Sequence, residues 1–320
     1  MSRAATYGSG WVLAAAVLWG TTGTAAALAP EVGSLAVGAA SMGLGGLLQA
    51  AAALRVLRTH RAGLVAQWRT LALAAAAVAV YPLAFYSSMR LAGVAVGTVV
   101  SIGSAPVAAA LIERVVDRQP LSRRWVLGAA FAVLGVLALA VARTGEAAPA
   151  AGASGKHPVL GIALGLLAGL TYALYSWGAA RMMRRGLPAR PVMGATFGLG
   201  GVLLMPVLLL TGAPIVESGR NLAIVAYLAV VPMFVGYVLF GRGLAVVSAS
   251  TATTLSLLEP AVAAVIAVVV LHDGLPALGW VGMGILLASL VLLTGDSRRQ
   301  SPDKASTLRP VPARAAEPVP

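Results

Sequence analysis

The sequence contains no cysteine, and only 10% of its 320 residues are charged. The absence of cysteine excludes disulfides, thiolate metal ligands and thiol nucleophiles. The low charge excludes a water-soluble globular surface, because soluble domains carry about 25% charged residues. The three histidines, His60, His157 and His272, lie far apart without the spacing of metal ligands, so neither a metal site nor a bound cofactor is predicted.

Long apolar runs take the place of the missing charge. Runs of about 20 residues recur from Gly10 to Leu293, and each is long enough to cross a hydrocarbon layer of about 30 Å as a helix. They lack the alternating polarity of membrane barrel strands, so helices are predicted. The predicted spans are Gly10 to Leu28, Leu35 to Leu54, Leu71 to Met89, Ala92 to Ile112, Trp125 to Val141, Val159 to Trp177, Val192 to Leu210, Leu222 to Phe240, Ala245 to Val270 and Pro276 to Leu293.

Basic residues gather in alternate connections between these spans. If the N-terminus is cytoplasmic, every Lys and Arg faces the cytoplasm except Arg90, Arg143, Lys156 and Arg220. Because cytoplasmic loops carry the excess of positive charge, this pattern predicts a multi-pass protein of the cell (plasma) membrane with cytoplasmic N- and C-termini. The net charge of +13 thus reflects topology within a lipid bilayer, and no nucleic-acid partner is expected.

The composition divides the chain into two predicted membrane units. Residues 143–158 are rich in Ala, Gly, Ser and Pro, which is typical of a linker. They separate a five-span unit at 1–142 from a second five-span unit at 159–294. The polar, proline-bearing segment 295–320 is predicted to be a disordered cytoplasmic tail.

The two units share an internal repeat. The segment Gly103 to Ala109 aligns with Leu257 to Ala263, which places Pro106 and Pro260 at equivalent positions near the middle of their spans. A repeat with an odd number of spans enters the membrane in opposite orientations. The predicted fold is therefore an all-α integral membrane protein with ten transmembrane helices arranged as two inverted five-helix repeats, an arrangement that recurs in secondary transporters.

Four short segments carry a resemblance to a known family. They are Leu18-Trp19-Gly20, Ser88-Met89-Arg90-Leu91, Ala105-Pro106-Val107 and Leu258-Glu259-Pro260-Ala261. With the two five-span units, they resemble the drug/metabolite transporter (DMT) superfamily in its EamA-type branch. The chain departs from the Gly-Glu pair usual in that family, having Asp117-Arg118 and His272-Asp273 at the two positions.

The resemblance implies a non-enzymatic secondary transporter of small organic metabolites, amino-acid-like compounds or drugs, often acting as an exporter. No ATP-binding Gly-x-x-x-x-Gly-Lys-Ser/Thr loop occurs, so a gradient is expected to supply the energy. A flippase of lipids or lipid-linked sugars with the same fold is the alternative. A receptor is disfavoured, since no soluble signalling domain is evident. A homodimer stays open, because small-residue helix faces support packing within or between chains.

Glu259 is the sharpest candidate for function, because it lies in the middle of its span, where an ionised side chain is expensive. Either it couples protons or contacts substrate, or it only joins helices, and both readings stay open. Helical spacing places other polar residues on matching faces, and three aromatics lie deep enough to line a cavity. The predicted pathway is Glu259, Ser256, Ser248, Thr98, Ser101, Trp19, Tyr81 and Tyr172, with helix breaks at Pro106 and Pro260.

Overall fold

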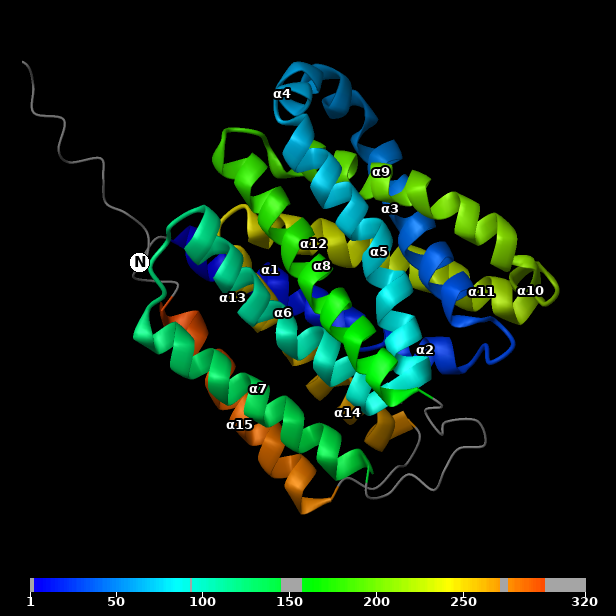
Figure 1. Cartoon of the computed structure of the whole chain (residues 1–320), viewed down its shortest axis with the longest axis vertical. Coiled ribbons are helices and arrows are strands. Elements are labelled where there is room, and N and C mark those ends of the chain that lie inside the picture. Colours follow the sequence, from blue (N-terminus) through cyan, green and yellow to red (C-terminus); the bar gives the residue numbers. More distant parts are fainter. Residues whose placement is uncertain (1–2, 93, 145–156, 271–275, 297–320) are drawn as a thin grey trace, which may run out of the picture.

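The computed structural model describes residues 3–92, 94–144, 157–270 and 276–296, and every regular element in these ranges is helical (Figure 1). This confirms the all-α prediction. The elements are α1 (Arg3–Trp19), α2 (Thr22–Ala27), α3 (Ser34–Thr59), α4 (Arg61–Ala66), α5 (Trp68–Ala92), α6 (Val94–Val116), α7 (Arg123–Thr144), α8 (Pro158–Arg184), α9 (Ala189–Thr211), α10 (Ala213–Val216), α11 (Gly219–Leu228), the π-helix η1 (Ala229–Val235), α12 (Gly236–Leu244), α13 (Ala249–Leu255), α14 (Leu258–Val270) and α15 (Ala277–Asp296).

In the described part of the chain, eight helical stretches are long and apolar enough to cross a membrane. They are Tyr7–Ala27, Ser34–Thr59, Trp68–Ala92, Val96–Val116, Pro158–Arg184, Ala189–Thr211, Gly219–Leu244 and Ala249–Ile266. Helices α7 and α15 pack along each other at one edge of the bundle and occupy the two remaining predicted spans. The ten-helix architecture is therefore as predicted. The predicted linker and tail fall mostly on residues 145–156 and 297–320, outside the described ranges.

The exterior of this bundle is apolar. Large side chains such as Val159, Leu209, Leu210 and Val291 are at least 70% exposed. Soluble proteins bury such residues or cover them with partners, whereas a lipid-facing surface favours their exposure. The surface is therefore that of a protein embedded in a bilayer.

Two groups of spans face each other across the centre of the bundle. We call α5, α6 and α8 the continuous group, because each spans without interruption. The interrupted group consists of α1–α2, α11–η1–α12 and α13–α14, each built from shorter pieces. Each group contains one span from one half of the chain and two from the other, as an inverted repeat requires. The outer pairs α3 with α9 and α7 with α15 join equivalent spans of the two halves.

Only one of the two predicted proline breaks is present as an interruption. Helix α6 runs through Pro106 without leaving the helical state, so the prediction of a break there is corrected. Between α13 and α14 the chain leaves the helix at Ser256 and Leu257, and Pro260 is the third residue of α14. Proline is tolerated in the first turn of a helix, where its missing N–H has no partner to lose. Pro260 accordingly lies in the first turn of α14.

Helices α3 and α9 touch through glycine. A Cβ atom added to Gly46 would overlap the carbonyl oxygen of Phe197, and one added to Gly201 would lie 2.6 Å from the carbonyl oxygen of Gly43. Small residues of this kind let transmembrane backbones approach directly. The two halves of the chain are thus joined here with no side-chain layer between them.

Candidate functional site

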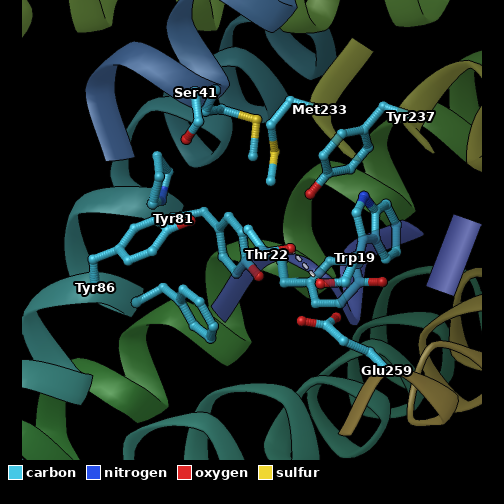
Figure 2. A pocket seen from close by; sticks show the side chains of 12 residues that line it. Trp19, Thr22, Ser41, Tyr81, Tyr86, Met233, Tyr237 and Glu259 are labelled. Carbon is cyan, nitrogen blue, oxygen red and sulfur yellow. Dashed lines mark hydrogen bonds between the residues drawn. The ribbon is translucent and has the colours of Figure 1, made fainter. Parts of the chain in front are cut away.

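A small cavity lies between the continuous and interrupted groups (Figure 2). Its volume is about 20 Å³, which is room for about one water molecule. A substrate can therefore enter only after the surrounding helices rearrange. The lining residues are Trp19, Thr22, Ser41, Met42, Tyr81, Pro82, Phe85, Tyr86, Tyr172, Met233, Tyr237 and Glu259.

Half of the lining residues of the cavity are aromatic. The ring of Trp19 lies 4.8 Å from that of Tyr237 and 6.4 Å from that of Tyr172, measured between centroids. Tyr81 lies 5.6 Å from both Tyr172 and Phe85. Such contacts stabilise the packed rings, and their faces attract cations. The cavity wall is therefore suited to a flat or cationic ligand.

Hydrogen bonds fix the orientation of these rings. The Nε1–H of Trp19 donates to the carbonyl oxygen of Pro232 at 2.9 Å, within the π-helix η1. The hydroxyl of Tyr172 donates to Ser256 Oγ at 2.8 Å, at the break between α13 and α14. The hydroxyls of Tyr175 and Tyr237 pair at 2.7 Å. Two of the three bonds therefore end at interruptions of the helices.

Glu259 lies in the first turn of α14, directly after that break. Its side chain is only partly buried, and Figure 2 shows its carboxylate pointing into the cavity near Trp19 and Thr22. Within the described ranges, no side chain or backbone group forms a hydrogen bond or ion pair with this carboxylate. A carboxylate held in the middle of a membrane span without a partner is costly to the fold. Its placement points to a ligand or a proton.

The structure brings together part of the predicted pathway. Glu259, Trp19, Tyr81 and Tyr172 line the cavity, and Ser256 lies behind Tyr172 as its acceptor. The other three predicted residues lie elsewhere, because α6 and α13 turn these faces toward other contacts. Thr98 donates to Met89 Sδ at 3.2 Å, and Ser101 is fully buried away from the cavity. Ser248 caps α13, accepting from the backbone N–H of Thr251 at 3.1 Å.

Other cavity residues escaped the sequence-based prediction. Tyr237 follows η1, whose wider turn rotates the next helix relative to a regular α-helical spacing. Thr22 stands among the neighbouring hydroxyls of Thr21 and Thr24 and Ser41 stands alone in an apolar helix, and nothing in their local sequence shows that these two line a cavity. The pairing of Tyr237 with Trp19, far apart in the chain, is visible only in three dimensions.

Two acidic residues close the bundle at the end where α6 and α8 finish, which we call the arginine-rich end. Asp117, directly after α6, accepts hydrogen bonds from Arg181 and Arg184 and from Trp177 Nε1, the last at 2.8 Å. The buried Glu113 accepts from the backbone N–H groups of Ala249 at 2.8 Å and Ser250 at 3.3 Å. The end of α6 is therefore hydrogen-bonded to both α8 and α13 at the arginine-rich end.

Comparison with known proteins identifies relatives of this chain. The sequence profile of the EamA-like transporter family matches residues 6–141 and again residues 159–295. An uncharacterized transporter of Bacillus subtilis, YwfM, is 31% identical over 297 residues, which is 92% of this chain and 96% of the relative. The uncharacterized inner membrane transporter YicL of Salmonella typhimurium is 26% identical over 137 residues, covering 43% of this chain and 45% of that protein.

A solved crystal structure shows the same fold. It superposes with a TM-score of 0.73 at 19% sequence identity, covering 92% of this chain and 99% of the other. At this identity the likeness concerns architecture alone.

Proposed function

Because the chain belongs to the EamA-like transporter family, we propose that it is a secondary active exporter of small organic metabolites with the aromatic cavity as its substrate site. The chain is a multi-pass membrane protein, and its relatives are transporters. The observation that carries the proposal is the Glu259 carboxylate, which faces the small aromatic cavity and has no hydrogen-bond or ion-pair partner among the residues that the structure describes. A cell-membrane location with the arginine-rich end in the cytoplasm completes the proposal.

The chemistry of the cavity favours a substrate with a protonated amine. A carboxylate attracts an ammonium group, and the rings of Trp19, Tyr81 and Tyr172 add cation–π attraction. Amino-acid-like compounds and amine-bearing drugs have both a cation and an apolar part. They match a wall that combines one carboxylate with aromatic surface.

A single carboxylate also provides a route to proton coupling. Glu259 can hold a proton or pair with an ammonium group, but a protonated carboxyl no longer attracts the cation as an ion. Binding of substrate and of proton are therefore mutually exclusive at this site, which is the requirement for exchange of one against the other. An inward proton gradient would then drive substrate outward.

Transport by alternating access also requires that the cavity is closed to one side of the membrane. In this proposal, the hydrogen bonds at the arginine-rich end provide that closure. In the proposed topology, Asp117 and Glu113 hold the cytoplasmic end shut in this conformation. Loading from the cytoplasm requires these bonds to open. Rocking of the two helix groups about the fixed cavity is the alternating-access motion typical of inverted repeats.

The test uses purified protein in liposomes with an imposed pH gradient and a panel of radiolabelled amines and matched neutral analogues. Wild-type protein is expected to exchange at least one amine for protons, and Glu259→Gln to lower that rate by at least about tenfold, since a neutral amide neither releases a proton nor pairs with a cation. The remaining rate in Glu259→Gln should not vary with pH.

Glu217→Gln is the matched control, because Glu217 is an exposed carboxylate at the surface. It should transport as wild type does. A Glu259→Gln protein that moves the same amines at wild-type rate and with wild-type pH dependence would remove Glu259 from the transport cycle.

The flippase alternative also has one supporting observation. An open hollow lies between α2, α11 and α14, and its wall is apolar except for two threonines and a tyrosine. An acyl or polyprenyl chain would fit such a surface. Fluorescent phospholipid or polyprenyl-phosphate analogues in the same liposomes decide between the two functions. Lipid movement without amine exchange would favour the flippase.

A further inference from the structure

A second and larger cavity lies near the arginine-rich end, between α3, α9, η1 and α12. Its volume is about 380 Å³, and none of its lining residues belongs to the central cavity. The π-helix η1 separates the two, since Met233 faces the central cavity and Phe234 faces the second. The lining residues are Gln49, Ala52, Ala53, Ala189, Arg190, Met193, Gly194, Phe234, Val238, Gly241 and Arg242.

Gln49 is one of the residues that line this second cavity. Its side chain is 3% exposed, and among the described residues neither its Nε2 nor its Oε1 has a hydrogen-bond partner. A buried amide without partners costs the fold its full desolvation penalty, so such groups are rare and call for an explanation. A polar group of a bound ligand provides one.

Two arginines lie at the opening of the cavity. Arg190 donates one hydrogen bond to the carbonyl oxygen of Ala52, and the guanidinium of Arg242 lies 5.3 Å from the ring centroid of Trp11. Within the described ranges neither forms an ion pair, and the cavity lining contains no carboxylate. A guanidinium has five N–H donors, so both retain donors for an anion.

The rest of the cavity wall is apolar. Met193, Phe234 and Val238 supply hydrophobic side chains to the same lining as Gln49 and the two arginines. We propose that this cavity binds the anionic head of an amphiphile, a phosphate or carboxylate held by Arg190, Arg242 and the amide of Gln49, with its apolar part against Met193 and Phe234. The site does not depend on the proposed amine transport, because it lies outside the central cavity.

Two sources supply this chemistry: an anionic membrane lipid and a soluble amphiphilic anion. The test titrates purified full-length protein in a neutral maltoside detergent and follows the thermal unfolding midpoint. The probes are a short-chain phosphatidylglycerol, the matched phosphatidylcholine, decyl phosphate and decanol. The anionic probes are expected to raise the midpoint in a saturable way, and their neutral or zwitterionic partners to leave it unchanged. A response to phosphatidylglycerol alone assigns the site to lipid, and a response to decyl phosphate alone assigns it to a soluble anion.

Gln49→Leu and the pair Arg190→Gln with Arg242→Gln should each shift the half-saturating probe concentration upward by about tenfold or more, since each removes charge-assisted or buried hydrogen bonds to the head group. Arg58→Gln is the matched control, because Arg58 is an exposed arginine of α3 outside the cavity. It should respond as wild type does. Glu259→Gln should also keep the response, which separates this site from the central cavity.

Equal midpoint shifts in wild type and all cavity variants would overturn the proposal, because the anion would then act on the general surface. Equal shifts with phosphatidylglycerol and phosphatidylcholine would overturn it as well. If Gln49→Leu does not purify as a single species, the arginine pair carries the test, and native mass spectrometry counts the bound phosphatidylglycerol directly. A count in the arginine pair equal to that of wild type would also contradict the proposal.

Discussion

The continuous and interrupted groups face each other across the cavity, yet they contribute different chemistry. The continuous group provides rings from α5 and α8, including Tyr81 and Tyr172, and α5 runs unbroken past Pro82 as α6 does past Pro106. The interrupted group provides the carboxylate of Glu259 and the Pro232 carbonyl oxygen to which Trp19 donates. Helix interruptions are tolerated in a membrane where the freed backbone is covered by protein or faces a cavity. One group therefore acts as a scaffold, and the other holds the polar chemistry.

Pro232→Ala is expected to have the largest effect, because it acts on the π-helix that interrupts one span of the interrupted group. Alanine restores the missing N–H and allows α11, η1 and α12 to form one regular helix, which would rotate Tyr237 and withdraw the Pro232 carbonyl from Trp19. Transport in liposomes is expected to fall by about tenfold, since small misplacements of site groups have large rate effects. Pro106→Ala, in the continuous helix α6, should change transport by less than about twofold. Equal losses in both variants would contradict the division into two groups.

Asp117→Asn tests whether the hydrogen bonds between Asp117 and α8 keep the arginine-rich end closed. The natural absence of cysteine makes a single Thr254→Cys substitution, one turn inside α13 and fully buried, a clean reporter. An impermeant maleimide should label it about fivefold faster in Asp117→Asn, because losing roughly 1 kcal/mol of ion-pair and hydrogen-bond energy shifts an opening equilibrium by that factor.

The control for this labelling experiment is Glu31→Gln. Glu31 is an exposed carboxylate outside the arginine-rich end, so its loss should leave the labelling rate unchanged. Unchanged labelling in Asp117→Asn as well would mean that its bonds to Arg181 and Arg184 do not limit opening.

Trp19→Phe and Tyr172→Phe give the smallest expected effects and compare one ring from each group. Trp19→Phe leaves the Pro232 carbonyl without its donor and should lower the free energy of unfolding by about 1 kcal/mol. Tyr172→Phe should cost about 0.5 kcal/mol, because Ser256 keeps its own hydrogen bond to the carbonyl oxygen of Thr253 at 2.7 Å. Denaturant unfolding in detergent measures both. A larger loss in Tyr172→Phe would reverse the comparison.

The sequence was sufficient to predict the helical fold because each membrane span is encoded locally by its apolar length. It also indicated Glu259, since a carboxylate in an apolar run is conspicuous. The positions of Thr98, Ser101 and Ser248 outside the cavity depend on how each helix is rotated by its neighbours, which helical spacing within one span does not determine.

The π-helix and the second cavity lay beyond sequence reasoning for related reasons. A widened turn at Pro232 is one of several responses a helix can make to proline, as the unbroken α6 around Pro106 demonstrates. Gln49 stands in an alanine-rich stretch, and its isolation is apparent only when its surroundings are known. Each membrane span can be recognised from its own residues, whereas the site depends on contacts between segments that lie far apart in the sequence.

The glycine contact between α3 and α9 bears on whether ions can leak across the membrane beside the protein's cavity. Gly46 lies against the Phe197 carbonyl and Gly201 against that of Gly43, so the two backbones meet directly at this part of the seam and leave no room there for a lipid tail. Sliding one helix past the other would push larger side chains into the space that only glycine fits. This contact can stay closed while other helices move, so in the proposed proton exchange it would keep protons from leaking beside the substrate cavity at this point.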